Sequence, residues 1–387
     1  MKLPSVPAKE PFAEDTIDFL NDVSKTLMKA PGSRAYSDVI TLAFWIRKAS
    51  TTKLKERFIP EDGDIHLGRG VVFHIAPSNV PVNFAYSMAA GLLLGNSNVV
   101  RVPSREFPQA TLIAGAIHKA LERHESIRPY IILVRYGRDK DINDTLSGIA
   151  DTRIVWGGDQ TIAELRKSEL PPRSNEVTFA DRYSLAVIDS DVYMASANIK
   201  DIAQAFYNDT YFTDQNACTS PRIVIWVGNR RPEAKERFWA ELHKLVERKY
   251  TFQAITGINK LTSSCLIAVN EPGARIEKHR DNLVVRVNVP RITDHLMDLK
   301  DNCGYFFEYD CDDILDLRPL CDDKRCQTVG ILGDEKIVLP LLRSGVKGID
   351  RIVPIGKTMD FDLIWDGYNL PALLTRTIRR GRGRAHL

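Results

Sequence analysis

The chain has 387 residues, of which 44% are hydrophobic, so it can bury a large core and is long enough for two domains. Its 53 basic and 50 acidic side chains leave a net charge of +3, which gives no general case for a nucleic-acid-binding protein. The longest apolar stretch, residues 84–95, is too short for a membrane span, so we expect a buried helix there.

The six cysteines indicate reduced thiols and a cytoplasmic protein, because no secretory start precedes them. Cys321 and Cys326 stand five apart without a second pair or a nearby histidine, so we predict no metal site. His74 lies in a strand-like run. We interpret it as a hydrogen-bonded core histidine, with a functional histidine as the alternative.

Helical spacing of apolar residues predicts helices over residues 11–29 and 37–49, which form a packing layer. From residue 71 onward, short β-branched runs alternate with helical segments. The expected strands are residues 71–76, 98–102, 131–134 and 153–156, and the expected helices are residues 83–94, 108–123, 139–147 and one after Gly157-Gly158. Such alternation predicts a doubly wound α/β domain with a parallel sheet and ligands at the carboxyl ends of its strands.

The loops after these strands carry polar side chains. Two prolines hold Asn79 after the first strand, where its amide can donate to an oxyanion. Arg101, Ser104 and Arg105 surround the end of the second strand and suit a phosphate, although solvated arginines are the alternative. Gly157-Gly158 would let a ligand approach the backbone, but no glycine follows with G-x-G-x-x-G spacing.

Cys218 lies between a helix-like segment and the β-branched run 222–227, among small and amide side chains. This setting favours a nucleophile, and a small core cysteine is the alternative. We place a first domain at residues 1–200 and a second α/β domain at 201–355, with a helix near 234–248, a strand near 282–289 and a helix near 334–343. We expect residues 356–387 to return to the first domain or to reach a partner subunit, and their basic tail is more typical of a solvated end than of a binding arm.

Taken together, the motifs resemble the aldehyde dehydrogenase superfamily, and within it the LuxC-like long-chain fatty-acyl-CoA reductases. The resemblance covers residues 65–230 and depends on the order of P-S-N-V-P at 77–81, G-N at 95–96, V-V-R-V-P-S at 99–104, G-G at 157–158, L-A-V-I-D-S-D at 185–191 and Q-N-A-C at 215–218. It implies an aldehyde-dehydrogenase-like fold, in which a doubly wound cofactor domain is joined to a second α/β domain that carries the nucleophilic cysteine.

The resemblance also implies roles for individual residues. Cys218 would accept the acyl group, and Asn79 with the Cys218 backbone N–H would donate to the oxyanion. The implied contacts to the dinucleotide come from Arg101, Ser104, Arg105, Gly157 and Gly158.

Three positions depart from the superfamily pattern. Glu176 stands one residue away from the place of the water-activating glutamate, which Val177 occupies. The lysine of K-P-S is replaced by Val102 or Arg101, according to where the gap is placed. Glu308 is a candidate for the glutamate that holds the nicotinamide ribose, and a surface glutamate is the alternative.

The expected function is therefore NADPH-dependent reduction of a fatty acyl-CoA thioester to an aldehyde through an acyl-cysteine. The arginines after the second strand favour NADPH, because a 2′-phosphate attracts guanidinium groups. We also expect a homo-oligomer and an acyl-transferring or acyl-activating partner enzyme. The alternatives are an NAD(P)-dependent aldehyde dehydrogenase that makes acids, and a catalytically idle scaffold or nucleic-acid binder.

Overall fold

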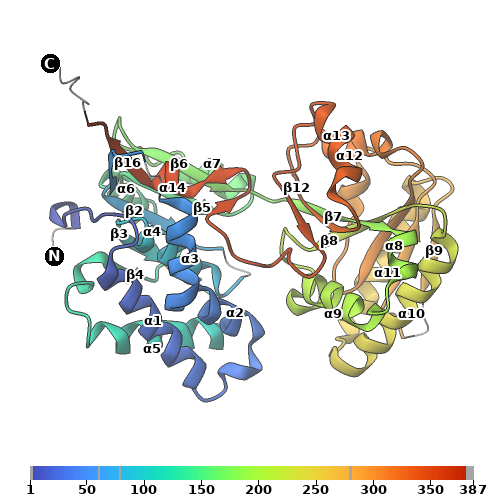
Figure 1. Cartoon of the computed structure of the whole chain (residues 1–387), viewed down its shortest axis with the longest axis horizontal. Coiled ribbons are helices and arrows are strands. Elements are labelled where there is room, and N and C mark those ends of the chain that lie inside the picture. The colour runs from blue at the N-terminus through green and yellow to red at the C-terminus, as the bar shows by residue number, and fades with distance from the viewer. Residues whose placement is uncertain (1–2, 60–61, 78–79, 279–280, 381–387) are drawn as a thin grey trace, which may run out of the picture. The chain divides into compact units, whose positions relative to one another are not determined.

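The computed structural model describes residues 3–59, 62–77, 80–278 and 281–380, which form two compact units (Figure 1). The first unit runs to Ala180 and resumes at Phe361, and the second spans Asp181–Asp360. The sequence placed the first boundary at residue 200. The boundary lies at residue 180 instead, because β7 (Tyr183–Asp189) already pairs within the sheet of the second unit.

A parallel sheet forms the centre of the first unit. Within the described residues it has five strands in the order β4-β3-β2-β5-β6. Their bounds are β2 (Val71–Ile75), β3 (Ser97–Arg101), β4 (Ile131–Val134), β5 (Thr152–Trp156) and β6 (Asn175–Phe179). Strands β2 and β5 are buried along their whole length, as expected for strands that helices cover on both faces.

Helices cover both faces of this sheet (Figure 1). One face packs against α1 (Glu14–Lys29), α2 (Ser37–Trp45), α4 (Asn83–Leu93) and α5 (Pro108–Leu121). The other packs against α6 (Lys140–Gly148) and α7 (Asp159–Leu165). The helix expected over 37–49 is divided into α2 and α3 (Lys48–Phe58), and the Asn21 side chain caps the start of α3 by accepting from the Lys48 N–H at 3.0 Å.

The C-terminal segment belongs to the first unit. Its strand β16 (Thr375–Ile378) pairs antiparallel with β1 (Ile65–Gly68), after β14 (Ile364–Trp365), β15 (Tyr368–Asn369) and α14 (Leu370–Leu374). Phe361 stacks on Tyr86 with ring centroids 4.8 Å apart, and the Tyr86 hydroxyl donates to the Asp362 carbonyl. The segment is therefore part of the core of this unit.

The second unit contains a larger sheet, which in the described part of the chain has seven strands in the order β13-β12-β7-β8-β11-β10-β9. Six strands are parallel, and β9 (Arg275–Lys278) runs antiparallel at the edge. The remaining strands are β8 (Pro221–Val227), β10 (Val285–Asn288), β11 (Tyr305–Asp310), β12 (Cys326–Leu332) and β13 (Arg351–Pro354).

One face of the second sheet packs against α8 (Ser190–Ala195), α9 (Ile199–Thr210) and α10 (Arg231–Lys249). The other packs against α11 (Ala254–Asn270), α12 (Arg318–Cys321) and α13 (Leu339–Arg343). The sequence predicted a helix near α10 and missed α11. Among the described residues, no helix combines the length and the apolar character that crossing a bilayer requires.

Candidate active site

Cys218 lies in a tight turn between α9 and the amino end of β8, and its side chain is half-buried. The Ser184 hydroxyl of neighbouring β7 donates to the Cys218 carbonyl at 2.7 Å, and the Ser220 N–H donates to the Ala217 carbonyl at 3.0 Å. These bonds fix the backbone on both sides of the sulfur. The turn therefore holds the thiol in one place while leaving it partly accessible.

The backbone before Cys218 adopts an unusual conformation. Asp214 and Gln215 have φ angles of 51° and 55°, and Cys303, whose N–H bonds the Asp214 carbonyl, has a φ of 59°. Left-handed backbone is uncommon in residues other than glycine, and it persists only where surrounding contacts enforce it. Such strain gathers at functional sites, so the turn that carries Cys218 has a feature typical of one.

The buried Gln215 side chain supplies those enforcing contacts. Its Oε1 accepts from the N–H groups of Gly304 and Tyr305 at 2.6 and 3.1 Å, and its Nε2 donates to the Pro221 carbonyl at 3.1 Å. The amide thus ties the cysteine turn to the start of β11. A sequence motif does not reveal this role, because the N–H groups that donate to Gln215 lie about 90 residues away along the chain.

Arg222, four residues after the cysteine, adds a buried positive charge. Its guanidinium donates to the Asp301 carbonyl at 2.9 Å, to the Asn302 side chain and to the Gln215 carbonyl. Burial lowers the pKa of Arg222 to about 10, and negative charge on Asp181 and on a Cys218 thiolate favours its charged form. Arg222 is therefore positive at neutral pH, close enough to attract a thiolate at Cys218.

Three other cysteines are less suited to nucleophilic attack. Burial raises the pKa of Cys303, and it raises that of Cys311 to about 12. A hydrogen bond with Cys321 and burial raise the pKa of Cys326 well above its usual range. Because the thiolate is the reactive form, a raised pKa makes these thiols weaker nucleophiles at neutral pH than an ordinary cysteine.

The first unit brings most of the predicted dinucleotide contacts to one edge of its sheet. Arg101 and Val155 both pair with Ile75 of β2, so the strands β3, β2 and β5 end at the same level. Ser104 and Arg105 follow β3 and are exposed, and Gly157-Gly158 follows β5. This edge is where parallel sheets bind nucleotides.

Arg101, predicted to contact the dinucleotide, makes contacts within the first unit. Its guanidinium donates to the Tyr136 and Gly137 carbonyls, at 2.9 Å for the latter, and lies 4.7 Å from the centre of the Tyr136 ring. Arg101 therefore joins β3 to the loop after β4. Arg105 lies 5.2 Å from the Phe107 ring centre on the exposed surface, so we retain Ser104 and Arg105 as the phosphate candidates.

The residues at this edge fit a dinucleotide. A Cβ atom at Gly158 would meet nothing within 4 Å, and Gly158 precedes α7, so its backbone is open to a ligand. A Cβ atom at Gly157 would lie 3.0 Å from Thr161. A side chain at 157 would crowd Thr161 of the adjacent helix, whereas at 158 there is open space.

Asn79 lies outside the described residues, so its expected role as an oxyanion donor stays a prediction. Glu176 lies on β6, where Arg153 donates to its Oε1 at 2.6 Å and Arg166 to its Oε2 at 2.7 Å. His74 is buried, with Ser87 at 2.7 Å and Asn98 at 2.8 Å from its ring nitrogens, and burial lowers its pKa to about 4. It is a neutral core histidine, as the sequence suggested.

Glu308 differs from both sequence-based expectations, because it is neither a surface residue nor placed to bind a ribose. It is 1% exposed in the middle of β11, where Trp226 and Trp239 donate to its Oε1 at 3.0 and 2.6 Å. Arg286 lies 3.5 Å from its other oxygen. Burial raises the pKa of this carboxyl, and its contacts commit it to the core.

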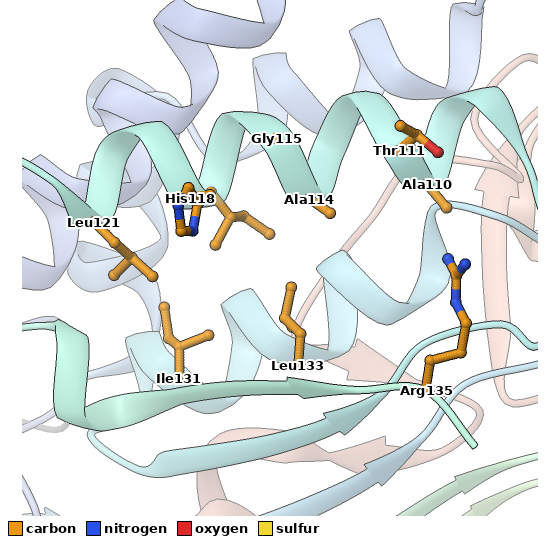
Figure 2. Close-up of a pocket in the computed structure, with 10 residues that line it drawn as sticks. Ala110, Thr111, Ala114, Gly115, His118, Leu121, Ile131, Leu133 and Arg135 are labelled. Atoms are coloured by element: carbon orange, nitrogen blue, oxygen red, sulfur yellow. The ribbon is translucent and has the colours of Figure 1, made fainter.

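Figure 2 shows a separate groove of about 710 Å³ on the first unit, between α5 and the edge strand β4. Ile131 and Leu133 of β4, with Arg135 just after the strand, face Ala114 and His118 of α5 across it. Its lining is mainly apolar and belongs to the side of the sheet that packs on α1 and α4. We therefore keep it apart from the polar edge that suits a dinucleotide.

The model of the LuxC family, described as acyl-CoA reductase, matches residues 54–253, which are 200 of the 387 residues. Among curated proteins, the long-chain acyl-protein thioester reductase of Aliivibrio fischeri is 24% identical over 294 residues, covering 74% of this chain and 58% of that protein. The protein of that name in Photorhabdus luminescens is 23% identical over 312 residues, covering 78% and 62%. The chain thus spans about three fifths of the length of these relatives.

Solved structures with a similar fold are aldehyde dehydrogenases and related oxidoreductases. A NAD-dependent benzaldehyde dehydrogenase from Corynebacterium glutamicum matches with a TM-score of 0.64 at 14% identity, covering 96% of this chain and 85% of that one. An oxidoreductase from Marinobacter aquaeolei matches with a TM-score of 0.67 at 13% identity, covering 98% and 88%. The predicted aldehyde-dehydrogenase-like fold is confirmed.

Proposed function

Since the chain belongs to the LuxC family of acyl-CoA reductases, we propose that it reduces an acyl thioester to an aldehyde through an acyl group held on Cys218. The observation that carries this proposal is a half-buried cysteine in a strained turn, with the buried cation Arg222 held against the same turn by the Gln215 carbonyl. A cation beside a cysteine favours the thiolate, which is the nucleophile.

In the first step the Cys218 thiolate attacks the thioester carbonyl carbon, and the carbonyl π electrons move to oxygen. The Cys218 N–H and the amide of Asn79 are the expected donors to that oxyanion. When the carbonyl re-forms, the bond to the donor sulfur breaks, and the donor leaves as a thiolate. Exchange between two thioesters changes the free energy little, so the step needs no external energy source.

A bound nicotinamide dinucleotide supplies the hydride that reduces the acyl group to the level of an aldehyde. Ser104, Arg105 and the backbone at Gly157-Gly158 would hold it in the first unit. The exposed Arg105 guanidinium favours a cofactor with a 2′-phosphate, so we propose NADPH. The aldehyde leaves when the carbon–sulfur bond breaks and Cys218 becomes a thiolate again.

The acyl donor is either a CoA thioester, as the family description states, or an acyl group on a partner protein, as the names of the relatives state. The same names suggest a long acyl chain. Both donors are thioesters in this proposal, so the chemistry at Cys218 is shared. An acyl-transferring partner and a homo-oligomer remain parts of the proposal.

Oxidation of an aldehyde to an acid is the second candidate, and one observation weighs against it. That reaction needs a carboxylate to activate water, and Glu176 is the residue nearest in sequence to the expected position. Arg153 and Arg166 occupy both of its oxygens. These contacts commit Glu176 to the structure of the first unit, which favours an acyl-cysteine that persists until it is reduced.

Labelling with radioactive acyl-CoA tests the proposal. The wild-type protein should gain a hydroxylamine-sensitive label, and Cys218→Ser should abolish labelling and aldehyde formation while leaving thermal stability unchanged, because a serine hydroxyl does not ionise at neutral pH. Cys265→Ser is the matched control, since Cys265 is an exposed thiol on α11. Labelling retained in Cys218→Ser, or lost equally in Cys265→Ser, would refute the assignment.

A further inference from the structure

Helix α11 shows the reverse of the usual pattern, because its apolar side chains face outward. Ile258, Leu261, Leu266 and Val269 are 61%, 55%, 50% and 80% exposed, and Thr262 and Cys265 between them are exposed as well. The side facing the protein instead contains Lys260 and Ser264. Surface helices normally bury their apolar face, so a contiguous outward stripe marks an interaction surface.

Polar contacts fix the rotation of this helix. The buried Lys260 ammonium donates to the Asn282 carbonyl at 2.7 Å, and the Ser263 hydroxyl donates to the Asp301 carboxylate at 2.8 Å. Turning the apolar stripe inward would break both bonds and expel Ile267 from the core. The stripe therefore stays exposed unless another molecule covers it.

The spacing of the stripe predicts what covers it. Ile255, Ile258, Thr262, Cys265 and Val269 follow intervals of three and four, the pattern by which one helix packs along another. A helix of 17 residues is about 25 Å long, enough for a sustained contact. The expected occupant is a second α-helix.

A second copy of α11 is complementary to the first. When two copies run antiparallel about a twofold axis at the level between residues 263 and 264, Ile258 lies opposite Val269, Leu261 opposite Leu266, and Thr262 opposite Cys265. In these three pairs large side chains meet large ones and small meet small, and Ile255, at the start of the helix, lies beyond the overlap. Antiparallel helices also oppose their dipoles favourably.

The charge of α11 argues against other occupants. Lys260 is its single charged residue, and it is buried. Helices that lie on membranes place lysine or arginine beside the apolar face, which α11 does not do. An acyl donor that leaves after each turnover also needs a more polar contact, whereas uncharged apolar surfaces are typical of permanent interfaces.

We propose that the α11 seam, defined as Ile258, Leu261, Thr262, Cys265, Leu266 and Val269, joins two copies of this chain by antiparallel packing. The interface is isologous, because a twofold axis relates the two copies and the same patch of each chain contacts the other. It does not depend on the proposed reaction, because no seam residue belongs to the cysteine turn.

Sedimentation equilibrium of the full chain tests the seam. We expect the wild type to self-associate and Val269→Glu to weaken the association at least tenfold, because it buries two carboxylates at the interface. Val192→Glu is the matched control, since Val192 is 44% exposed on α8. Circular dichroism should show equal folding of both variants.

A monomeric wild type, an unchanged Val269→Glu, or an equal effect of Val192→Glu would overturn the proposal. A wild-type monomer that co-sediments with phosphatidylcholine vesicles would assign the face to lipid instead, which also overturns it.

Cross-linking tests the antiparallel register independently. Under mild oxidation Thr262→Cys should form a disulfide with Cys265 of the second copy, visible as a band of twice the mass on a non-reducing gel. Adding Cys265→Ser should remove the band. A self-associated Thr262→Cys protein that gives no such band would refute the register.

Discussion

The two units arrange their candidate site residues in opposite ways. In the first unit, Ser104, Arg105 and Gly158 lie in exposed loops at the carboxyl edge of a parallel sheet, and few internal contacts hold them. In the second unit, Cys218 precedes β8 at the amino end of the strand, and buried side chains hold its turn.

This difference matches the two tasks in the proposed function. A dinucleotide binds through many weak contacts, so an open edge with exposed donors is sufficient, and single losses have small effects. A nucleophile must be held within a fraction of an ångström of its reaction path, so its supports are buried and strained. Substitutions in the second unit should therefore have larger effects than the same substitutions in the first.

The largest effect is expected from Arg222→Gln. The change removes the cation beside Cys218 and leaves the buried carbonyls of Gln215 and Asp301 without donors. We expect the rate of acyl labelling to fall on the order of 100- to 1,000-fold and the pH dependence of labelling to move to higher pH. Stopped labelling reactions over a pH series measure both.

Arg105→Gln is the matched control, since it makes the same change on an exposed arginine of the first unit. It should leave acyl labelling within about twofold of wild type. A substitution on the exposed surface usually changes the free energy of unfolding by less than about 0.5 kcal/mol. Equal losses in both variants would contradict the distinction between the open edge and the supported turn.

Mild acid should shift the stability of the two units in opposite directions. Burial lowers the pKa of His74, in the first unit, to about 4, and raises that of Asp209, in the second, to about 6. The unfolded histidine has a pKa of 6.5, so below that pH the unfolded state binds a proton more readily than the folded state. The contribution of His74 to the free energy of unfolding is therefore lost as the pH falls toward 4. For Asp209 the folded state binds protons more readily, so stability is gained as the pH falls from 6 to 3.8.

Urea unfolding of variants checks both signs. Relative to His74→Gln, the wild type should lose about 3 kcal/mol of unfolding free energy as the pH falls from 6.5 to 4. Relative to Asp209→Asn, it should gain about 3 kcal/mol as the pH falls from 6 to 3.8. Differences that stay constant with pH would show that neither group changes its pKa on folding.

The fold was predictable because local patterns determine most of it. Runs such as Val71–Ile75 are strands by composition, and their alternation with helices implies a parallel sheet. Helix α11 was missed, since its apolar residues face solvent and its buried side carries Lys260. The domain boundary was misplaced because β7 resembles the strands before it and only its pairing assigns it to the second sheet.

The candidate site was predictable only where a residue acts through its own chemistry and its neighbours along the chain. Cys218 could be identified in this way, whereas the roles of Gln215 and Arg222 depend on contacts with residues 301–305. The same limit explains Glu308, whose tryptophan partners lie 82 and 69 residues away. A local sequence motif carries no information about partners that lie so far along the chain.

The smallest predicted effect concerns cofactor choice at the open edge. Arg105 is exposed and its described contact is with the Phe107 ring, so its guanidinium is accessible to a 2′-phosphate. The nearby acid, Glu106, lies 3.9 Å from Arg135, which offsets its charge. The local charge therefore favours NADPH over NADH.

Arg105→Ala should accordingly raise the Michaelis constant for NADPH about tenfold, roughly 1.4 kcal/mol, and leave that for NADH nearly unchanged. One ionic contact at an exposed edge cannot contribute much more binding free energy than this, because water and salt screen it. Steady-state kinetics of aldehyde formation with each cofactor measures the effect, and raising the ionic strength should reduce it. If the wild type used NADH and NADPH with equal efficiency, Arg105 would be a solvated surface residue and the open edge would not distinguish the two cofactors.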